Sequence, residues 1–268
     1  MRFILIAAKH LDSAKTRLAP ALPAGERRVL AEAMFRDVLA AALGARRAEN
    51  VAVVTSDSTL LELARSTGAL TIDEEFPRGL NAAVALATSQ LIAQGASTVC
   101  TVLSDIPMIA AEDIDAVFDA MPAPRGAVLV PSRDFSGTNV ICRAPGDAVA
   151  TRFGRMSLVK HLDDCRTRDL PAKVLRLVRP ALDLDVIEDL GEFVRAGQPT
   201  HTLNQLLFGR LSRRACPWGH TLAVLRLVRK LVESRRPTPS RRTSCPVGEG
   251  GIKSAFPSGR AAPGSGPG

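Results

Sequence analysis

The sequence predicts an α/β fold in which a mostly parallel sheet is flanked by helices. Short apolar runs alternate with longer segments that repeat apolar residues at helical spacing, which is typical of parallel strands joined by right-handed crossovers. The clearest strand is the run VCTVLSD at 99–105, which is rich in β-branched residues and stops at Asp105. Open α/β sheets bind ligands at the carboxyl ends of their strands, so Asp105 is the first candidate site residue.

The other expected elements follow in order along residues 1–208. A long helix at 23–43 carries an apolar stripe at helical spacing, and Ser56 and Asp57 are predicted to cap the next helix, which ends before Gly68. We expect further strands at 3–8, 51–55, 69–72, 126–131, 140–142, 172–178 and 182–185, and further helices at 80–94, 111–121, from 157 onward and at 187–196.

The charge of the chain is unevenly distributed. The formal net charge is +8, but residues 209–268 carry 12 Lys+Arg against 2 Asp+Glu, which leaves residues 1–208 with a net charge of −2. We therefore expect a folded domain at 1–208 and a disordered basic tail at 209–268, rich in Pro, Gly, Ser and Arg. The pattern at 220–236 is that of a basic amphipathic helix.

The composition also indicates the cellular compartment. The five cysteines form no CxxC pair, which argues against zinc, and their scatter suits a reducing compartment. No apolar run approaches the roughly 18 residues that a membrane span needs, and the first apolar run is too short for a signal peptide. We expect a cytoplasmic protein that does not contact a membrane. The sequence does not fix the oligomeric state, and a homodimer is compatible with it.

Basic residues follow the first predicted strand. Lys9, Lys15 and Arg17 would hold a polyphosphate through charge-assisted hydrogen bonds, although a solvated surface loop has the same composition. The loop has no glycine, so it is neither a P-loop nor a Rossmann turn. Asn81 stands at the start of the helix at 80–94, where it would read a base or ribose edge; an ordinary helix cap is the alternative.

Acidic residues supply the expected metal site. Asp183 and Asp185 are two residues apart, so on a strand both would face the same way, and two neighbouring carboxylates repel unless a cation lies between them. Together with Asp105 they are expected to bind a divalent metal. For Asp105 alone, the alternative is a strand-terminating residue that caps the next turn.

Two polar stretches are expected to bind an anionic substrate. In SRDFSGTN at 132–139, Thr138 supplies a hydroxyl, and a hairpin turn is the alternative. Gly154 is followed three residues later by Ser157 at a helix start, a combination that suits a phosphate or carboxylate. His161 is interpreted as a surface or core-edge residue rather than as a catalytic one.

The order of these motifs resembles a known family. AAKHLDSAKTRL, RGLNAAV, LSDIPM, GTN, RFGRMS and LDLDVIEDL, spread over residues 2–208, are similar to motifs of the guanylyltransferases of coenzyme F420 biosynthesis. The chain lacks the glycine-rich first turn of sugar-nucleotide pyrophosphorylases and molybdenum-cofactor guanylyltransferases. The resemblance implies a nucleotide-diphospho-sugar-transferase type of fold, Rossmann-like and related to the glycosyltransferase-A fold.

The resemblance also implies an activity and a set of site residues. The expected reaction transfers GMP from GTP to a small phosphorylated three-carbon acid, with Mg²⁺ as cofactor. By position, Asp105, Asp183 and Asp185 match the family's metal-binding acids, Thr138, Gly154 and Ser157 match its acceptor contacts, and Lys9, Lys15, Arg17 and Asn81 fall in its nucleotide-binding segments. Lys15, Arg17 and Asp105 are the expected catalytic residues.

Two alternatives stay open at this point. One is another nucleotidyltransferase, either a cytidylyltransferase or a molybdenum-cofactor guanylyltransferase. The other is a non-enzymatic protein that binds nucleic acid through its basic tail, which predicts salt-dependent binding that disappears when residues 209–268 are removed. The acidic balance of residues 1–208 and the paired carboxylates favour an enzyme that does not bind nucleic acid.

Overall fold

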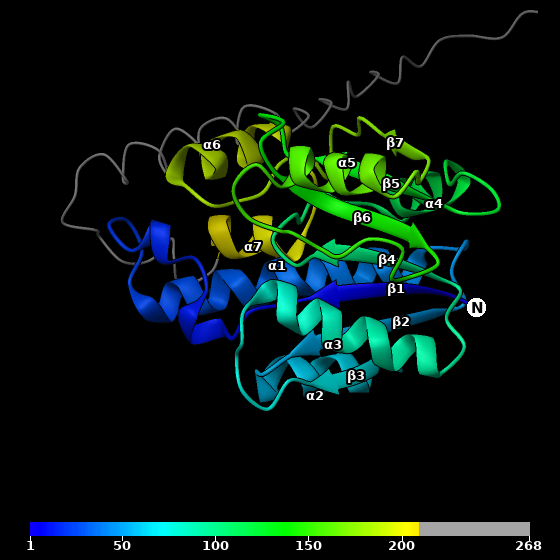
Figure 1. Cartoon of the computed structure of the whole chain (residues 1–268). Coiled ribbons are helices and arrows are strands. Elements are labelled where there is room, and N and C mark those ends of the chain that lie inside the picture. The colour runs from blue at the N-terminus through cyan, green and yellow to red at the C-terminus, as the bar shows by residue number, and fades with distance from the viewer. Residues whose placement is uncertain (209–268) are drawn as a thin grey trace, which may run out of the picture. The chain divides into compact units, whose positions relative to one another are not determined.

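The computed structural model describes residues 1–208. They form a seven-stranded sheet in the order β3-β2-β1-β4-β6-β5-β7 (Figure 1). The expected tail at 209–268 and its helix at 220–236 lie outside the described residues. None of the helices within residues 1–208 is long and apolar enough to cross a membrane.

The sheet is mostly parallel, as the sequence predicts. Within residues 1–208, β6 alone runs antiparallel to its two neighbours, β4 and β5, and the other neighbouring pairs are parallel. The short turn between β5 and β6 leaves no room for a crossover helix, which is why these two strands form a hairpin. The strands are β1 (Arg2–Ala7), β2 (Asn50–Thr55), β3 (Leu70–Asp73), β4 (Thr98–Leu103), β5 (Gly126–Pro131), β6 (Thr138–Ala144) and β7 (Ala172–Val174).

Helices cover both faces of the sheet, so the central strands are buried on both sides (Figure 1). In β1, Ile4 and Ile6 belong to a core cluster shared with α1, whereas Phe3 and Leu5 belong to a second cluster shared with α3. A third cluster joins α5 to β5 and β6. The helices are α1 (Ala24–Gly44), α2 (Ser58–Ser66), α3 (Leu80–Ala93), α4 (Ala111–Asp119), α5 (Ser157–Thr167), α6 (Ile187–Ala196) and α7 (His201–Phe208).

Two expected strands differ from the structure. The strand expected at 172–178 ends at Val174, and the segment 182–185 is an extended loop rather than a strand. The carboxylate of Asp189 accepts hydrogen bonds from the backbone N–H groups of Asp185 and Val186, so these donors cannot join a sheet ladder. The alternation persists in the loop: Leu184 is buried in the core, and the acids on either side of it face a pocket.

Candidate active site

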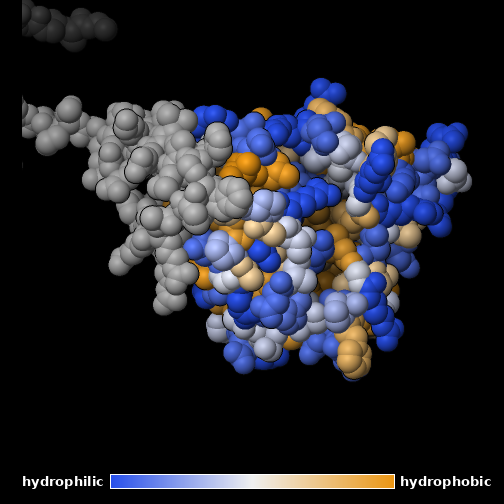
Figure 2. Space-filling model, turned by 90° about the vertical axis from the view of Figure 1, so that its left-hand side faces the viewer, coloured by the Kyte–Doolittle hydropathy of each residue, from blue (hydrophilic) through white to orange (hydrophobic). Residues whose placement is uncertain are grey.

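A pocket of about 610 Å³ opens at the carboxyl ends of β1 and β4. Because β6 runs antiparallel, its first residues lie at this same edge of the sheet. Figure 2 looks onto this side of the molecule and shows apolar side chains within a hollow that polar side chains border. Nine of the ten predicted site residues line the pocket, namely Lys9, Lys15, Arg17, Asp105, Thr138, Gly154, Ser157, Asp183 and Asp185.

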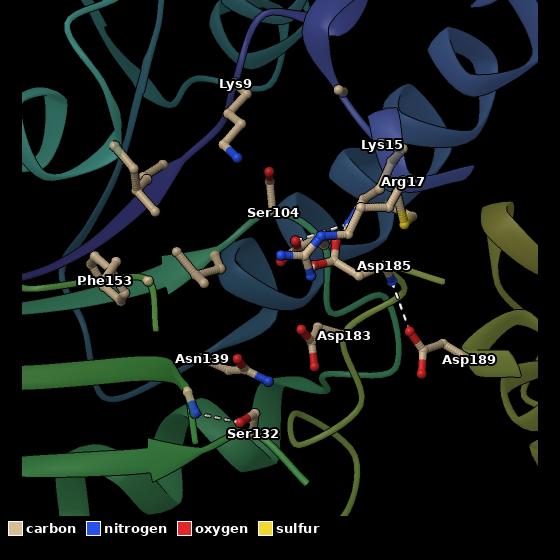
Figure 3. Close-up of a pocket in the computed structure, with 18 of the residues that line it drawn as sticks. Lys9, Lys15, Arg17, Ser104, Ser132, Asn139, Phe153, Asp183, Asp185 and Asp189 are labelled. Atoms are coloured by element: carbon tan, nitrogen blue, oxygen red, sulfur yellow. Dashed lines mark hydrogen bonds and ion pairs between the residues drawn. The ribbon is translucent and has the colours of Figure 1, made fainter. Parts of the chain in front are cut away.

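Lys15 forms the centre of the charged side of this pocket (Figure 3). It sits between two 3₁₀ helices, η1 (Leu11–Ser13) and η2 (Thr16–Leu18), with a left-handed backbone (φ 53°, ψ 39°). Its ammonium Nζ donates to Oδ2 of Asp105 at 2.9 Å and to Oδ1 of Asp185 at 2.8 Å. Burial by itself would lower the pKa of Lys15, but the two carboxylates outweigh it and raise the pKa above its usual value.

The three acids experience different environments. Burial, together with the charges of Asp105 and Asp185, raises the pKa of Asp183 to about 6. Burial acts on Asp185 in the same direction, but Lys15, with smaller contributions from Arg17 and Lys9, lowers its pKa. The side chain of Asp105 has one oxygen, Oδ2, on Lys15, whereas Oδ1 is buried and has no hydrogen-bond partner among the described residues.

The expected cluster of three carboxylates around one ion is not formed. Within residues 1–208, no group of three or more His, Cys, Asp or Glu side chains lies close enough to hold a single metal ion. The ammonium of Lys15 stands between Asp105 and Asp185 instead. The buried, unpartnered Oδ1 of Asp105 and the carboxylate of Asp183 in the same pocket are hard oxygen donors of the kind that Mg²⁺ prefers, so the residues fit a divalent cation through these two acids.

The loop that carries Asp183 and Asp185 is anchored on both sides. Arg179 donates two hydrogen bonds to the carboxylate of Asp113 on α4, at 2.7 and 2.9 Å. The amide of Asn139, at the start of β6, donates to the carbonyl of Pro180 at 2.9 Å and to that of Ala181 at 3.3 Å. The backbone N–H of Leu184 donates to the carbonyl of Asp105. These contacts hold the loop beside the end of β4.

The other two cations of the basic loop are more exposed. The side chain of Arg17 is 74% exposed and reaches Oδ2 of Asp185 at 3.4 Å. The side chain of Lys9 points into the pocket (Figure 3) and has no hydrogen-bond or ion-pair partner among the described residues. Both are therefore available to an anionic ligand that enters the pocket.

Thr138, Gly154 and Ser157 also line the pocket. The turn before Thr138 is a hairpin turn, the alternative that the sequence left open, and the Oγ of Ser132 accepts from the N–H of Gly137 at 2.7 Å. A Cβ at Gly137 would lie 2.8 Å from that Oγ, so a side chain there would displace the Ser132 hydroxyl from this hydrogen bond. Ser157 begins α5, and its Oγ is buried without a hydrogen-bond partner among the described residues.

Asn81 is the predicted site residue that does not line the pocket. Its side-chain carbonyl accepts from the N–H of Phe153 at 2.7 Å, and its amide donates to the carbonyl of Phe153 at 3.1 Å. Phe153 and the following Gly154 do line the pocket. The structure therefore places Asn81 outside the pocket lining, on the exposed surface, where its amide group is paired with the backbone of Phe153.

A family model described as "Guanylyl transferase CofC like" matches residues 1–213 of the chain. The chain belongs to this guanylyltransferase family. It is 37% identical to the phosphoenolpyruvate guanylyltransferase of Sphaerobacter thermophilus over 188 residues, which are 70% of this chain and 90% of that protein. It is 35% identical to the 2-phospho-L-lactate guanylyltransferase of Methanothermobacter thermautotrophicus over 202 residues, which are 75% and 88% of the two chains.

A third relative is named for another phosphorylated acid. The chain is also 34% identical to the 3-phospho-D-glycerate guanylyltransferase of Phenylobacterium zucineum over 194 residues, covering 71% of this chain and 88% of that protein. These guanylyltransferase relatives establish a nucleotidyltransferase enzyme, and the non-enzymatic alternative is not favoured.

A solved structure supports the same fold. A structure described as a nucleotide-diphospho-sugar transferase from Desulfovibrio desulfuricans G20 superposes with a TM-score of 0.61 at 18% identity, covering 87% of this chain and 97% of that one. At this level of identity the likeness shows the fold alone. It confirms the nucleotide-diphospho-sugar-transferase type of architecture that the sequence motifs imply.

Sequence reasoning missed several residues that shape the site of this guanylyltransferase. Asn139 and Ser132 line the pocket, and both lie in the polar stretch at 132–139, from which only Thr138 was predicted as a site residue. His161 is not at the surface: it is fully buried and bonds to Thr138 and to the backbone of Arg152. A histidine one turn into a helix that starts at a predicted anion site was the available signal.

Proposed function

We propose that this protein transfers GMP from GTP to the phosphate of a small phospho-carboxylate in coenzyme F420 biosynthesis, with release of pyrophosphate. The acceptor is phosphoenolpyruvate, 3-phospho-D-glycerate or 2-phospho-L-lactate, the acids named in the relatives. The observation that carries the proposal is one pocket that is lined by cations, by acids and by a helix start that bears a hydroxyl. All of these substrates would be cytoplasmic metabolites.

The chemistry needs little from the protein besides positioning and charge. A phosphate oxygen of the acceptor is already anionic near neutral pH, so it attacks the α-phosphorus of GTP without a general base. The bond from the α-phosphorus to the bridging oxygen then breaks, and pyrophosphate leaves with the electron pair. Preorganised charges that match the developing negative charge are the main contribution of such a site.

Each side chain has a distinct part in this proposal. Lys9 and Arg17, which are exposed in the pocket, bind the β- and γ-phosphates and stabilise the departing pyrophosphate. Lys15 holds Asp105 and Asp185 in place and keeps one ammonium N–H for a phosphate oxygen, because two of its three donors are used.

The acceptor is held by other residues of the same pocket. We assign its anionic groups to Thr138, to the backbone at Gly154 and to the start of α5 at Ser157, since N–H groups at a helix N-terminus favour anions. Asn81 contributes by holding Phe153 rather than by touching nucleotide in the present arrangement. This refines its assignment as a nucleotide-binding residue.

The divalent cation is assigned to Asp105 and Asp183, with Asp185 nearby. When bound there, Mg²⁺ supplies positive charge that neutralises the crowded phosphates. Asp105 offers its unpartnered Oδ1, and Asp183 offers a carboxylate whose pKa is raised by burial and by the charges of Asp105 and Asp185, so a nearby cation would relieve this repulsion.

A product assay tests the proposed function directly. The purified chain is incubated with Mg²⁺, GTP and each of the three acids in parallel, and mass spectrometry identifies a product that contains GMP linked to the acid. Parallel reactions with CTP and ATP measure pyrophosphate release and test the alternative nucleotidyltransferases. We expect product with GTP and with at least one acid; release with CTP alone would replace this proposal by the cytidylyltransferase alternative.

A further inference from the structure

The hydrogen bonds of His161 determine which of its ring nitrogens carries the proton. His161 lies on α5 and is 0% exposed. Its Nε2 lies 2.7 Å from the backbone nitrogen of Arg152. A backbone N–H can only donate, so Nε2 is the acceptor and carries no proton. In a neutral imidazole the proton therefore sits on Nδ1.

The surroundings keep the ring neutral. Burial is the main cause that lowers the pKa of His161, to about 4, and Arg143 on β6 acts in the same direction. The other charged groups that face the ring are Asp164 and Lys160 on α5 and Arg152 in the loop before it, and of these only Asp164 favours the charged form. The Nδ1–H tautomer is therefore the form present near neutral pH.

This tautomer fixes the direction of a hydroxyl in the pocket. Nδ1 lies 3.1 Å from Oγ1 of Thr138, and since Nδ1 carries the proton, Oγ1 accepts. Thr138 is 2% exposed and lines the pocket, and its Oγ1 has no other partner among the described hydrogen bonds. With one lone pair taken by His161, the hydroxyl proton is left free to be donated to a ligand oxygen.

We propose that His161 is a positioning residue that turns the hydroxyl proton of Thr138 toward an anionic oxygen of the acceptor acid. The proposal rests on the proposed function and deepens it, because it makes Thr138 an obligate donor. A carboxylate or phosphate oxygen only accepts hydrogen bonds, whereas a freely rotating hydroxyl would also present its lone pairs. His161 thereby favours a ligand oxygen that only accepts hydrogen bonds, such as that of a carboxylate or phosphate, over a group that donates one at this position.

The same histidine also supports the neighbouring wall. Its bond to Arg152 N fixes the residue before Phe153, and Asn81 holds Phe153 itself through two hydrogen bonds. The ring of Phe153 packs edge-on against the imidazole, with centroids 5.6 Å apart. The donor role toward Thr138 and the acceptor role toward Arg152 use different ring nitrogens, so they can be separated by mutation.

Two amide variants, each of which replaces one ring nitrogen, separate these roles. In His161→Asn, the amide nitrogen takes the place of Nδ1 and can still donate to Thr138, whereas the contact with Arg152 is lost. In His161→Gln, the longer side chain reaches the position of Nε2 and can accept from Arg152, whereas the donor to Thr138 is lost. Steady-state kinetics with GTP and the preferred acid measure the KM of each substrate.

We expect His161→Gln to raise the KM of the acid by about tenfold or more, as for one hydrogen bond to a charged group, with the KM of GTP unchanged. We expect His161→Asn to stay within about threefold of the parent. Equal effects of the two variants on both substrates would show a merely structural histidine and would overturn the proposal.

A double-mutant cycle with Thr138→Val completes the test. If His161 acts through the Thr138 hydroxyl, Thr138→Val alone raises the KM of the acid, and adding His161→Gln to Thr138→Val raises it little further. Thr138→Ser, which keeps the hydroxyl, should have the KM of the parent. Additive effects would contradict the proposal while parent turnover still supports the proposed function; a parent that transfers GMP to none of the acids would instead overturn that function. Nitrogen NMR of the unmodified protein tests the geometry without a variant, because an Nε2–H tautomer for His161 is incompatible with it.

Discussion

Lys15 and Asp105 are 90 residues apart in the sequence, yet Nζ of Lys15 lies 2.9 Å from Oδ2 of Asp105. The lysine side chain is 6% exposed and the aspartate side chain is 27% exposed, so the pair is largely withdrawn from water. The same ammonium reaches Asp185 on the loop before α6. The buried ammonium of Lys15 thus connects the loop after β1 to the end of β4 and to the loop that carries Asp183 and Asp185.

We expect Lys15→Met to be the most damaging single change in the pocket. Removing one partner of a fully buried ion pair destabilises a protein by about 3–5 kcal/mol, and we expect less here, since Asp185 is 37% exposed. The expected loss is about 1–3 kcal/mol in urea unfolding, together with a fall in turnover of at least about 100-fold. Lys9→Met is the matched control for stability, because Lys9 is exposed, and unfolding equal to that of Lys15→Met would contradict this prediction.

Asp37 connects α1 to α7 and offers a test of the fold that leaves the pocket intact. Its carboxylate accepts from the N–H groups of His201 and Thr202 and from the Thr202 hydroxyl. Asp37→Ala leaves these donors without a partner and should destabilise the protein by about 1–3 kcal/mol. Asp37→Asn, which keeps one acceptor oxygen, should lose less. Urea unfolding measures both; Asp37 does not line the active-site pocket, so turnover of the folded fraction should not change.

Stability at mildly acidic pH should depend on His161. Its pKa lies at about 4 in the folded protein and near 6.5 when unfolded, so between these values the unfolded chain binds the extra proton. Its contribution is complete above about pH 6.5 and is lost as the pH falls toward 4, by on the order of 2 kcal/mol between about pH 7.5 and about pH 5. Asp183, with a folded-state pKa of about 6, acts in the opposite direction over part of this range.

The comparison of parent and His161→Gln isolates the histidine, because Asp183 is present in both. We expect the free energy of unfolding to fall more steeply in the parent than in the variant when the pH is lowered. Identical pH dependence in the two proteins would show that His161 does not carry this effect.

The central strands were predictable because a continuous apolar run within a few residues of sequence indicates a strand that is buried on both faces. β1 and β4 are continuous apolar runs, and the structure buries them on both faces as expected. The strand predicted at 182–185 is wrong. Its apolar and acidic residues alternate as in a strand, but the backbone N–H of Asp185 bonds to the carboxylate of Asp189 and not to a neighbouring strand. Alternation reports which side chains are buried, and it does not report where the backbone donors go.

The site was predictable in its members and less so in its contacts. Motif spacing selected the acids and the basic loop, and the topology brings them to one edge of the sheet. The pairing of Lys15 with two of the acids, and of Asn81 with the backbone of Phe153, joins segments far apart in the chain. Such partners depend on tertiary packing, which a single sequence does not report.

The rate of pyrophosphate release should depend on a divalent cation bound by Asp105 and Asp183. If Asp105 and Asp183 hold the cation, chelation abolishes pyrophosphate release, and Asp183→Asn raises the Mg²⁺ concentration needed for half-maximal rate by about tenfold or more. Titration of Mg²⁺ in the rate assay measures this shift. An unchanged Mg²⁺ dependence in Asp183→Asn would exclude this residue as a ligand.

If the carboxylate of Asp105 at the end of β4 serves the transfer of GMP, its loss must slow the reaction, and the rate of Asp105→Asn measures this. This change keeps the volume of the side chain and removes its charge. Asp12→Asn is the control, because Asp12 is exposed and pairs with Arg28 outside the pocket. We expect pyrophosphate release from GTP and the acid to fall by about 10²–10³-fold in Asp105→Asn and to stay at the parent rate in Asp12→Asn. Parent-like turnover by a folded Asp105→Asn protein would contradict it.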